Sequence, residues 1–309
     1  MNKNIAILGA AGHIAKGLIV IFSGQGNCNL FLFSRAGQKI RDFISNHQIN
    51  NVLICNYSEF EIHSYNIIIN CVGAGTPEKV EELGKDIFRI TQDYDGLVID
   101  YLKKKPDTKY FYLSSGVVHL PHLQKYTVPE DAFSLDISHV DPTDYYGLAK
   151  ICAEKRHRSL SQLRIIDIRV FAYFSRFIDL NSRFLLTSLV DCALKKMTFL
   201  THPKNIVRDY IHPFDLYAFI NSLAKSSEQN MAVDIYSKSP VTKFELLAFF
   251  KEKYGLDYTI EDDFSVTNPT GEKDEFYPHR RNDASFDYVP KYSSLEAIEA
   301  ELIELKNNL

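Results

Sequence analysis

The sequence predicts an α/β protein built on a doubly wound parallel sheet, with a smaller, mainly C-terminal second domain. Three observations indicate this fold. Short apolar runs alternate with amphipathic stretches through the first half of the chain, a glycine-rich turn follows the first run, and the alternation stops after Val170. With 309 residues, of which 45% are hydrophobic and 24% charged, the chain has the length and the ordinary composition of a two-domain globular protein.

Six of the apolar runs are expected to form strands that are buried on both faces. Such strands are continuously apolar, because helices cover the sheet on both sides. The runs are residues 4–8, 29–33, 51–55, 66–72, 109–113 and 163–170. Amphipathic helices are expected between them, most clearly over 76–105 and from about Thr143. Strands and helices in this alternation predict right-handed βαβ crossovers.

The chain after Val170 is expected to form most of the second domain. Its predicted helices cover 182–196, 213–224, 242–253 and 293–306, and its extended pieces cover 198–201, 207–212 and 233–236. The polar, aromatic-rich stretch 261–282 is expected to be a long loop. We assign residues 1–170 to the sheet domain, with 205–232 returning to it, and residues 171–204 and 233–309 to the second domain.

Charge and apolar patterning exclude several classes of protein. The formal net charge of −4 provides no basic field for nucleic acid. No apolar run reaches the 18 residues of a membrane span, and the start of the chain lacks the pattern of a secretory signal, so we expect a cytoplasmic protein. The five cysteines are widely spaced and contain no C-x-x-C pair, so no metal site is expected.

The turn after the first predicted strand, GAAGHIA at residues 9–15, has the small residues that a dinucleotide needs. They allow a tight turn and a close approach of the backbone to a pyrophosphate, while the following helix offers its N–H groups. This arrangement predicts a Rossmann domain that binds NAD or NADP. The expected cofactor contacts are Gly9, Ala11, Gly12, His13 and Ile14, with Cys71, Val72 and Gly73 at the end of the fourth strand.

The end of the second predicted strand bears on the choice of cofactor. NAD-binding folds usually carry an acidic residue there for the ribose 2′-hydroxyl, and this chain has Ser34 and Arg35. A hydroxyl and a guanidinium suit a 2′-phosphate, which favours NADP over NAD. Alternatively, Arg35 stacks on adenine or faces solvent, and the enzyme accepts both cofactors.

A tyrosine and a lysine four residues apart suggest the chemistry. Tyr146 and Lys150 share one face of a predicted helix, and Ser114 and Ser115 follow the fifth strand at the edge where ligands bind. A tyrosine that acts as acid and base at neutral pH needs a lowered pKa, which Lys150 and an oxidised nicotinamide would both provide. Tyr145 lacks a lysine four residues later and is expected to pack or to line the cleft.

These features resemble the extended short-chain dehydrogenase/reductase family, in its nucleotide-sugar epimerase, reductase and dehydratase branch. The similar segments are GAAGHIA, YLSSGVVH, YGLAK, RVFAYF, VRDYIHPFDL and YVPKYSSLEAI. The resemblance implies that Ser115 is the catalytic serine, with Ser114 as the fallback, and that Arg208 binds the pyrophosphate of a nucleotide sugar. It also implies a homodimer, formed through the helix of Tyr146 and the long helix before the fifth strand.

Departures from the family pattern narrow the expected reaction. Gly116 and Val117 stand where 4,6-dehydratases carry Asp-Glu, and Val117 also replaces the cysteine of the GDP-fucose synthase type. With dehydration and the GDP-fucose synthase reaction disfavoured, the expected reaction is hydride transfer at one carbon of the sugar. Arg35 favours a keto-sugar reductase that uses NADPH; the alternatives are a nucleotide-sugar 4-epimerase with tightly bound NAD and, less favoured, a catalytically silent NAD(P)-binding sensor or scaffold. Because Ala172 replaces a substrate-binding asparagine, other substrate contacts are expected from Arg176 or Arg183, and from Arg280 or Arg281.

Overall fold

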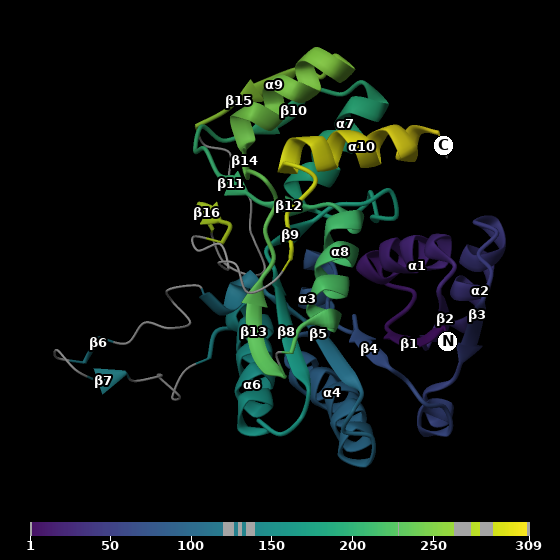
Figure 1. The fold of residues 1–309 in the computed structure, drawn as a ribbon. Helices are drawn as coiled ribbons and strands as arrows, with labels where there is room; N and C mark the ends of the chain where they lie inside the picture. The colour runs from purple at the N-terminus through teal and green to yellow at the C-terminus, as the bar shows by residue number, and fades with distance from the viewer. Residues whose placement is uncertain are drawn as a thin grey trace.

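The computed structural model describes residues 2–119, 127–128, 132–133, 140–227, 229–262, 273–278 and 287–307. Its core is a sheet of seven strands in the order β13-β8-β5-β4-β1-β2-β3, and every pairing in it is parallel (Figure 1). The strands are β1 (Lys3–Leu8), β2 (Cys28–Phe33), β3 (Val52–Cys55), β4 (Ile67–Asn70), β5 (Lys109–Ser115), β8 (Ile165–Val170) and β13 (Asn230–Asp234).

The strand order confirms the doubly wound sheet that the sequence predicts. From β1 the chain builds outward through β2 to β3, then returns to the other side of β1 to form β4. Ligands bind doubly wound sheets at this switch point, outside the carboxyl ends of the strands. The extended piece expected over 233–236 in the second domain instead begins at Asn230 and pairs with β8, so the sheet domain continues through Asp234.

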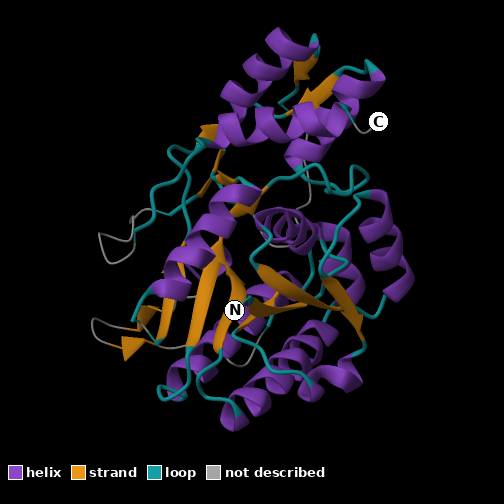
Figure 2. Ribbon diagram, turned by 45° about the vertical axis from the view of Figure 1, so that its right-hand side comes forward, coloured by secondary structure: helices purple, strands orange, loops and turns teal. Residues whose placement is uncertain are grey.

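Two layers of helices cover the sheet, because alternate strand residues face opposite sides. Ile5 and Ile7 face one layer, formed by α1 (His13–Gln25), α2 (Gly37–Asn46) and α8 (Pro213–Lys225). Ala6 and Leu8 face the other, which contains α4 (Asp86–Lys104) and α6 (Tyr145–Ser159). Figure 2 shows the sheet between these layers. The continuous apolar character of the strands follows from burial on both sides.

Two predicted helices differ from the observed ones. The stretch 76–105 forms α3 (Pro77–Leu83) and α4, separated at Gly84, whose φ of +47° ends the first helix. Near Thr143 a 3₁₀ turn (Pro142–Asp144) precedes α6. Two further 3₁₀ turns, η1 (Tyr57–Ile62) and η2 (Gly116–His119), follow β3 and β5. Within the described residues, no helix has the length and hydropathy to cross a bilayer.

The second domain contains three helices around their own apolar cluster, α7 (Leu185–Lys195), α9 (Lys243–Tyr254) and α10 (Ser294–Lys306). They confirm the helices predicted there. The short strands, several of which the sequence did not predict, are β6 (Thr127–Val128), β7 (Ala132–Phe133), β9 (Ala172–Tyr173), β10 (Phe199–Thr201), β11 (Val207–Arg208), β12 (Tyr210–Ile211), β14 (Val241–Thr242), β15 (Tyr258–Ile260) and β16 (Glu275–Phe276). β16 lies in the predicted long loop and pairs with β11, which brings that part of the loop beside Arg208.

Candidate active site

The glycine loop joins β1 to α1 at the switch point. Gly9 has φ +71°, and a Cβ there would lie 3.0 Å from backbone atoms of Cys71 and Val72, so both the conformation and the space require glycine. The N–H of Gly12 donates to the Gly9 carbonyl oxygen at 2.8 Å, and Gly12 is the N-cap of α1. The loop is therefore a tight turn that directs the start of α1 toward the crevice.

The start of α1 fits the pyrophosphate of a dinucleotide. Among the described residues, no side chain caps this helix end, and its first turn carries no acidic residue. Its first N–H groups and the positive end of its dipole are thus available to phosphate oxygens. The His13 side chain turns inward and packs edge-on against Tyr173, with ring centroids 4.9 Å apart. Burial lowers the pKa of His13 to about 3, so this residue can offer the cofactor its backbone N–H but no charge.

Close packing of α1 depends on a glycine that the sequence analysis did not use. The sequence assigns the third small position of the loop to Ala15, which is fully buried. At Gly17, however, a Cβ would lie 2.1 Å from the Tyr173 hydroxyl oxygen and 3.3 Å from the Cβ of Pro213. Gly17 therefore lets α1 pack against α8 and β9. A glycine inside a helical pattern was the available signal.

The end of β2 carries the two residues expected to select NADP. The Ser34 hydroxyl accepts a hydrogen bond from the Ala36 N–H at 3.0 Å, and Arg35 is exposed. Beside them lies Tyr57, which the sequence analysis missed. Its hydroxyl accepts a hydrogen bond from the Gly9 N–H at 3.1 Å and donates one to the Phe33 carbonyl oxygen at 3.2 Å.

The residues after β4 connect the glycine loop to the Tyr146 helix. The Cys71 N–H donates to the Leu8 carbonyl oxygen at 3.0 Å, and the Val72 N–H donates to the Asn70 side chain at 2.9 Å. A Cβ on Gly73 would lie 3.8 Å from the Lys150 Nζ. The predicted cofactor contacts at this strand end thus lie between Gly9 and Lys150.

Ser115, Tyr146 and Lys150 are brought together at the carboxyl end of β5. The Ser115 hydroxyl is close enough to the Tyr146 phenol to lower its pKa. The Lys150 ammonium is buried; it donates to the Leu113 carbonyl oxygen at 2.8 Å and to the Tyr112 hydroxyl at 3.1 Å, and lies 5.8 Å from the centre of the Tyr146 ring. The three side chains therefore lie together at the carboxyl end of β5, at the edge of the sheet where ligands bind.

The pKa of Tyr146 differs from the expectation. Burial raises it above its ordinary value, and the hydrogen bond with Ser115 offsets part of the rise. The predicted lowering by Lys150 is not seen, because the ammonium is directed at Leu113 and Tyr112. Burial also lowers the pKa of Lys150 to about 8, although the Glu154 carboxylate acts in the opposite direction. In this structure Tyr146 is a neutral phenol at pH 7.

Ser114, the alternative serine, belongs to a different set of contacts. Its hydroxyl donates to the Glu154 carboxylate at 2.6 Å, and the same carboxylate accepts from the Arg169 guanidinium at 2.6 Å. Arg169 also lies 3.5 Å from Asp234 at the end of β13. Ser114 thus ties α6 to the end of the sheet, and Ser115 is the serine that contacts Tyr146.

Two of the predicted substrate arginines lie in ion pairs. Arg176 lies 2.8 Å from the buried carboxylate of Glu301 and 2.6 Å from Glu304, both on α10. Arg183 pairs with Glu78 at 2.8 Å and with Glu81, both on α3. The structure thus places both guanidinium groups on acidic residues of neighbouring helices. Arg280 and Arg281 lie outside the described residues.

Arg208 is near a second cation that the sequence analysis missed. Its guanidinium donates to the Val207 carbonyl oxygen at 2.8 Å. Lys273 is close enough for the two charges to interact, and burial together with the Arg208 charge lowers the pKa of Lys273 to about 7. The Lys273 ammonium lies 4.9 Å from the ring centre of Phe276, which packs in one apolar cluster with Tyr146. A single lysine in a polar loop gave no signal in the sequence.

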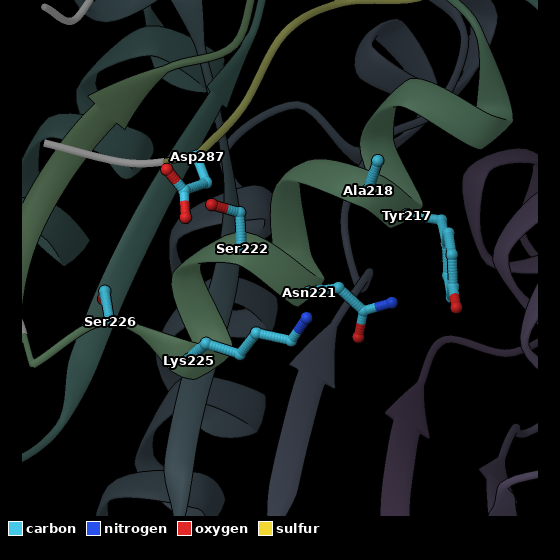
Figure 3. Close-up of a pocket in the computed structure, with 7 residues that line it drawn as sticks. All are labelled: Tyr217, Ala218, Asn221, Ser222, Lys225, Ser226 and Asp287. Atoms are coloured by element: carbon cyan, nitrogen blue, oxygen red, sulfur yellow. The ribbon is translucent and has the colours of Figure 1, made fainter. Parts of the chain in front are cut away.

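A surface hollow elsewhere in the fold includes none of these residues. It measures about 410 Å³ and follows one side of α8, with Asp287 across from the helix (Figure 3). It ends at Ser226, whose carbonyl oxygen accepts a hydrogen bond from Lys109, the first residue of β5. This hollow is therefore near the amino edge of the sheet, opposite the edge that carries Ser115.

Comparisons with known proteins show solved structures of the same fold. UDP-N-acetylglucosamine 4-epimerase from Methanobrevibacter ruminantium, solved with UDP-N-acetylmuramic acid, is 14% identical with a TM-score of 0.77 over 100% of this chain and 99% of that one. UDP-glucuronic acid 4-epimerase from Bacillus cereus, solved with UDP-glucuronic acid and NAD, is 14% identical with a TM-score of 0.74 over 99% and 100%. dTDP-glucose 4,6-dehydratase from Bacillus anthracis, solved with NAD, is 16% identical with a TM-score of 0.73 over 99% and 97%.

At these identities the likeness to solved structures establishes the fold. A comparison with curated protein sequences gives no match. The family model described as the NAD dependent epimerase/dehydratase family matches residues 5–237, well over half of the chain, from the first strand through the end of the sheet domain. The chain therefore belongs to the NAD-dependent epimerase/dehydratase family.

Proposed function

We propose that this enzyme is a nucleotide-sugar 4-epimerase that keeps NAD bound throughout its cycle. The observation that carries the proposal is the nearness of Ser115 to Tyr146, beside Lys150, while Gly116 and Val117 after Ser115 offer no acid or base. The sequence-based preference for a keto-sugar reductase rests on Arg35, which is an exposed side chain. The two solved 4-epimerases, and the NAD named with one of them, favour the epimerase alternative.

The residues divide the reaction between them. Bound NAD would accept the hydride from the sugar carbon and return it to the opposite face. Tyr146 takes the hydroxyl proton and later returns it, which requires the phenolate. Ser115 donates a hydrogen bond to the reacting oxygen as charge develops there. Lys150, whose ammonium lies 5.8 Å from the centre of the Tyr146 ring, would hold the nicotinamide ribose.

The residues proposed to bind NAD lie from the glycine loop at the start of α1 to Gly73 and Lys150. Gly9 and Gly12 leave room for the pyrophosphate at the start of α1, and Gly73 leaves the cofactor a path past Lys150. Since the Tyr146 phenol is neutral in this structure, the positive nicotinamide that NAD brings would be needed to lower the pKa of Tyr146. The phenolate would then form only in the loaded enzyme.

The diphosphate of the substrate would bind beside the paired strands β11 and β16. Arg208 and Lys273 are adjacent cations there, and both are near the apolar cluster that includes Tyr146. A diphosphate can accept hydrogen bonds from both side chains at once. This placement would put the sugar beyond the diphosphate, toward Tyr146 and Ser115. The homodimer and the cytoplasmic location expected from the sequence stay predictions.

The first experiment identifies the nucleotide released from the denatured protein, by chromatography against the four nicotinamide standards. We expect NAD or NADH. The protein is then given UDP-sugars, and we expect the 4-epimer to form without net change in NADH absorbance. Net consumption of NADPH with a reduced sugar product would instead establish the reductase and contradict the proposal.

A further inference from the structure

Tyr57 occupies the corner between the carboxyl ends of β1 and β2. It opens the 3₁₀ turn that follows β3, the next strand in the sheet (Figure 1). Its ring is held against Tyr94 of α4, with ring centroids 4.7 Å apart, and against Phe33 at 5.8 Å. The hydroxyl is therefore fixed in position by packing as well as by its two hydrogen bonds to the strand ends.

This corner is the place where dinucleotide-binding sheets receive the adenosine ribose. The acceptor for the 2′-hydroxyl is ordinarily a carboxylate at the end of the second strand. Here that position is Ser34, and its oxygen already accepts from the Ala36 N–H. The next residue, Arg35, is a donor only. A bound NAD would therefore find no carboxylate for its 2′-hydroxyl at the end of β2.

Building on the proposed function, we infer that the Tyr57 phenolic oxygen is the acceptor for the 2′-hydroxyl, and that it lets the enzyme use NAD without an acidic residue at the end of β2. The Tyr57 proton is committed to the Phe33 carbonyl oxygen at 3.2 Å, so the hydroxyl faces the crevice as an acceptor. One lone pair receives the Gly9 N–H, and a second is left for a ribose hydroxyl.

The same geometry disfavours a 2′-phosphate. A phosphate oxygen needs donors, and the phenol has already donated its proton to Phe33. Burial raises the pKa of Tyr57, so the phenol stays protonated at neutral pH and the roles of the two hydrogen bonds do not change. Arg35 is an exposed cation. Its hydrogen bonds to a 2′-phosphate would therefore be weaker than those of donors that the fold holds in place. The inference thus predicts NAD over NADP.

The test measures the dissociation constants of NAD, NADP and 2′-deoxyadenosine NAD by isothermal titration calorimetry, on the wild type and on Tyr57→Phe. In the wild type we expect NAD to bind about 10-fold more tightly than its 2′-deoxy analogue, the size of one hydrogen bond. In Tyr57→Phe this difference should vanish, and the ratio of NADP to NAD affinity should rise at least about 5-fold. Tyr65→Phe is the matched control, because its hydroxyl bonds the Phe60 carbonyl oxygen at 2.9 Å, away from the loop.

Each other outcome overturns the inference in a different way. If wild-type protein binds NAD and the 2′-deoxy analogue equally, Tyr57 makes no bond to the 2′-hydroxyl, and this result needs no variant to fold. If Tyr57→Phe weakens NAD and NADP by the same factor, the hydroxyl only supports the Gly9 turn. In both cases the proposed epimerase stands. Failure of the wild type to bind any dinucleotide would overturn the proposed function together with the inference.

Discussion

The ring of Phe171 lies against Gly116, so that a Cβ on Gly116 would be 2.4 Å from the Phe171 Cδ1 atom. Gly116 follows Ser115 directly, at the position where elimination enzymes of the family carry an aspartate. Phe171 in turn contacts Phe276, with ring centroids 5.1 Å apart. An aromatic wall thus fills the space that a catalytic carboxylate would need, which is the physical reason to expect hydride transfer without elimination.

Adding a methyl group to Gly116 tests whether the ring of Phe171 fills the space beside it. Gly116→Ala should displace Phe171 and lower the free energy of unfolding by about 1–3 kcal/mol, as overpacking of a close contact does. Epimerase activity should fall as well, because Ser115 is the adjacent residue. Urea unfolding and steady-state kinetics measure the two effects.

Gly24→Ala is the control for this substitution. In the part of the chain that is described, nothing lies within 4 Å of a Cβ built on Gly24, which is inside α1. Alanine should stabilise that helix by about 0.5–1 kcal/mol. Equal destabilisation by both substitutions would show that the contact between Phe171 and Gly116 has no special effect.

Removing the phenolic oxygen of Tyr146 should separate chemistry from binding. We expect Tyr146→Phe to lower kcat by about 10²–10⁴-fold, the usual contribution of a general acid and base. NAD affinity and the unfolding midpoint should stay near wild-type values, since the ring is retained. Tyr145→Phe, one residue away and packed on Phe88 at 5.7 Å, should keep its activity. Near wild-type turnover in Tyr146→Phe would refute the assigned role.

Arg176 should affect folding rather than substrate binding. Hydrogen bonds from His212 and Arg176 outweigh the effect of burial on Glu301 and lower its pKa to about 2. Arg176→Gln leaves that buried carboxylate without its main partner and should cost about 3 kcal/mol of stability. The KM for the sugar nucleotide should not change. A raised KM at unchanged stability would restore the substrate role expected from the sequence.

Arg183→Gln serves as the comparison. Arg183 and its two glutamate partners are largely exposed, and exposed ion pairs contribute little. No measurable change in the unfolding midpoint is expected for this variant.

The stability of the protein should depend on pH through His157. Burial by itself would lower its pKa, but Asp167 at 2.6 Å and Asp95 at 2.8 Å outweigh burial and raise the pKa to about 9. A folded pKa above the unfolded one stabilises the fold fully below about pH 6.5, and this contribution disappears as the pH rises through 9. His157→Gln should therefore lower stability by about 3 kcal/mol at pH 6 and by much less at pH 9.5, measured by urea unfolding. A loss of stability in His157→Gln that does not vary with pH would show that His157 is not charged beside Asp167 and Asp95.

Binding of the substrate diphosphate should take up a proton. The pKa of Lys273 is about 7 before an anion arrives, and a nearby diphosphate should raise it. At pH 8 the lysine is mostly neutral in the free enzyme and charged in the complex. Calorimetry of UDP binding in buffers with different heats of ionisation counts this proton, and Lys273→Met should abolish the uptake. Uptake that persists in Lys273→Met would place the proton on another group.

The sequence by itself determined the local and periodic features. Runs such as 4–8 and 109–113 had to be strands buried on both faces, Gly9 and Gly12 had to form a turn before a helix, and the spacing of Tyr146 and Lys150 had to place them on one helical face. These features depend on the backbone conformation of each residue and on the spacing of apolar residues. Both are set by residues that are close together in the sequence.

Contacts between distant segments were decided only by the tertiary structure. The sequence could not show that Arg176 meets Glu301, or that Lys273 comes beside Arg208, because each pair joins different elements of the fold. Nor could it show that Tyr57 reaches Gly9, 48 residues away, or that burial raises the pKa of Tyr146. The identity of a charged side chain is fixed by the sequence, but its partner and its desolvation depend on which surfaces the fold brings together.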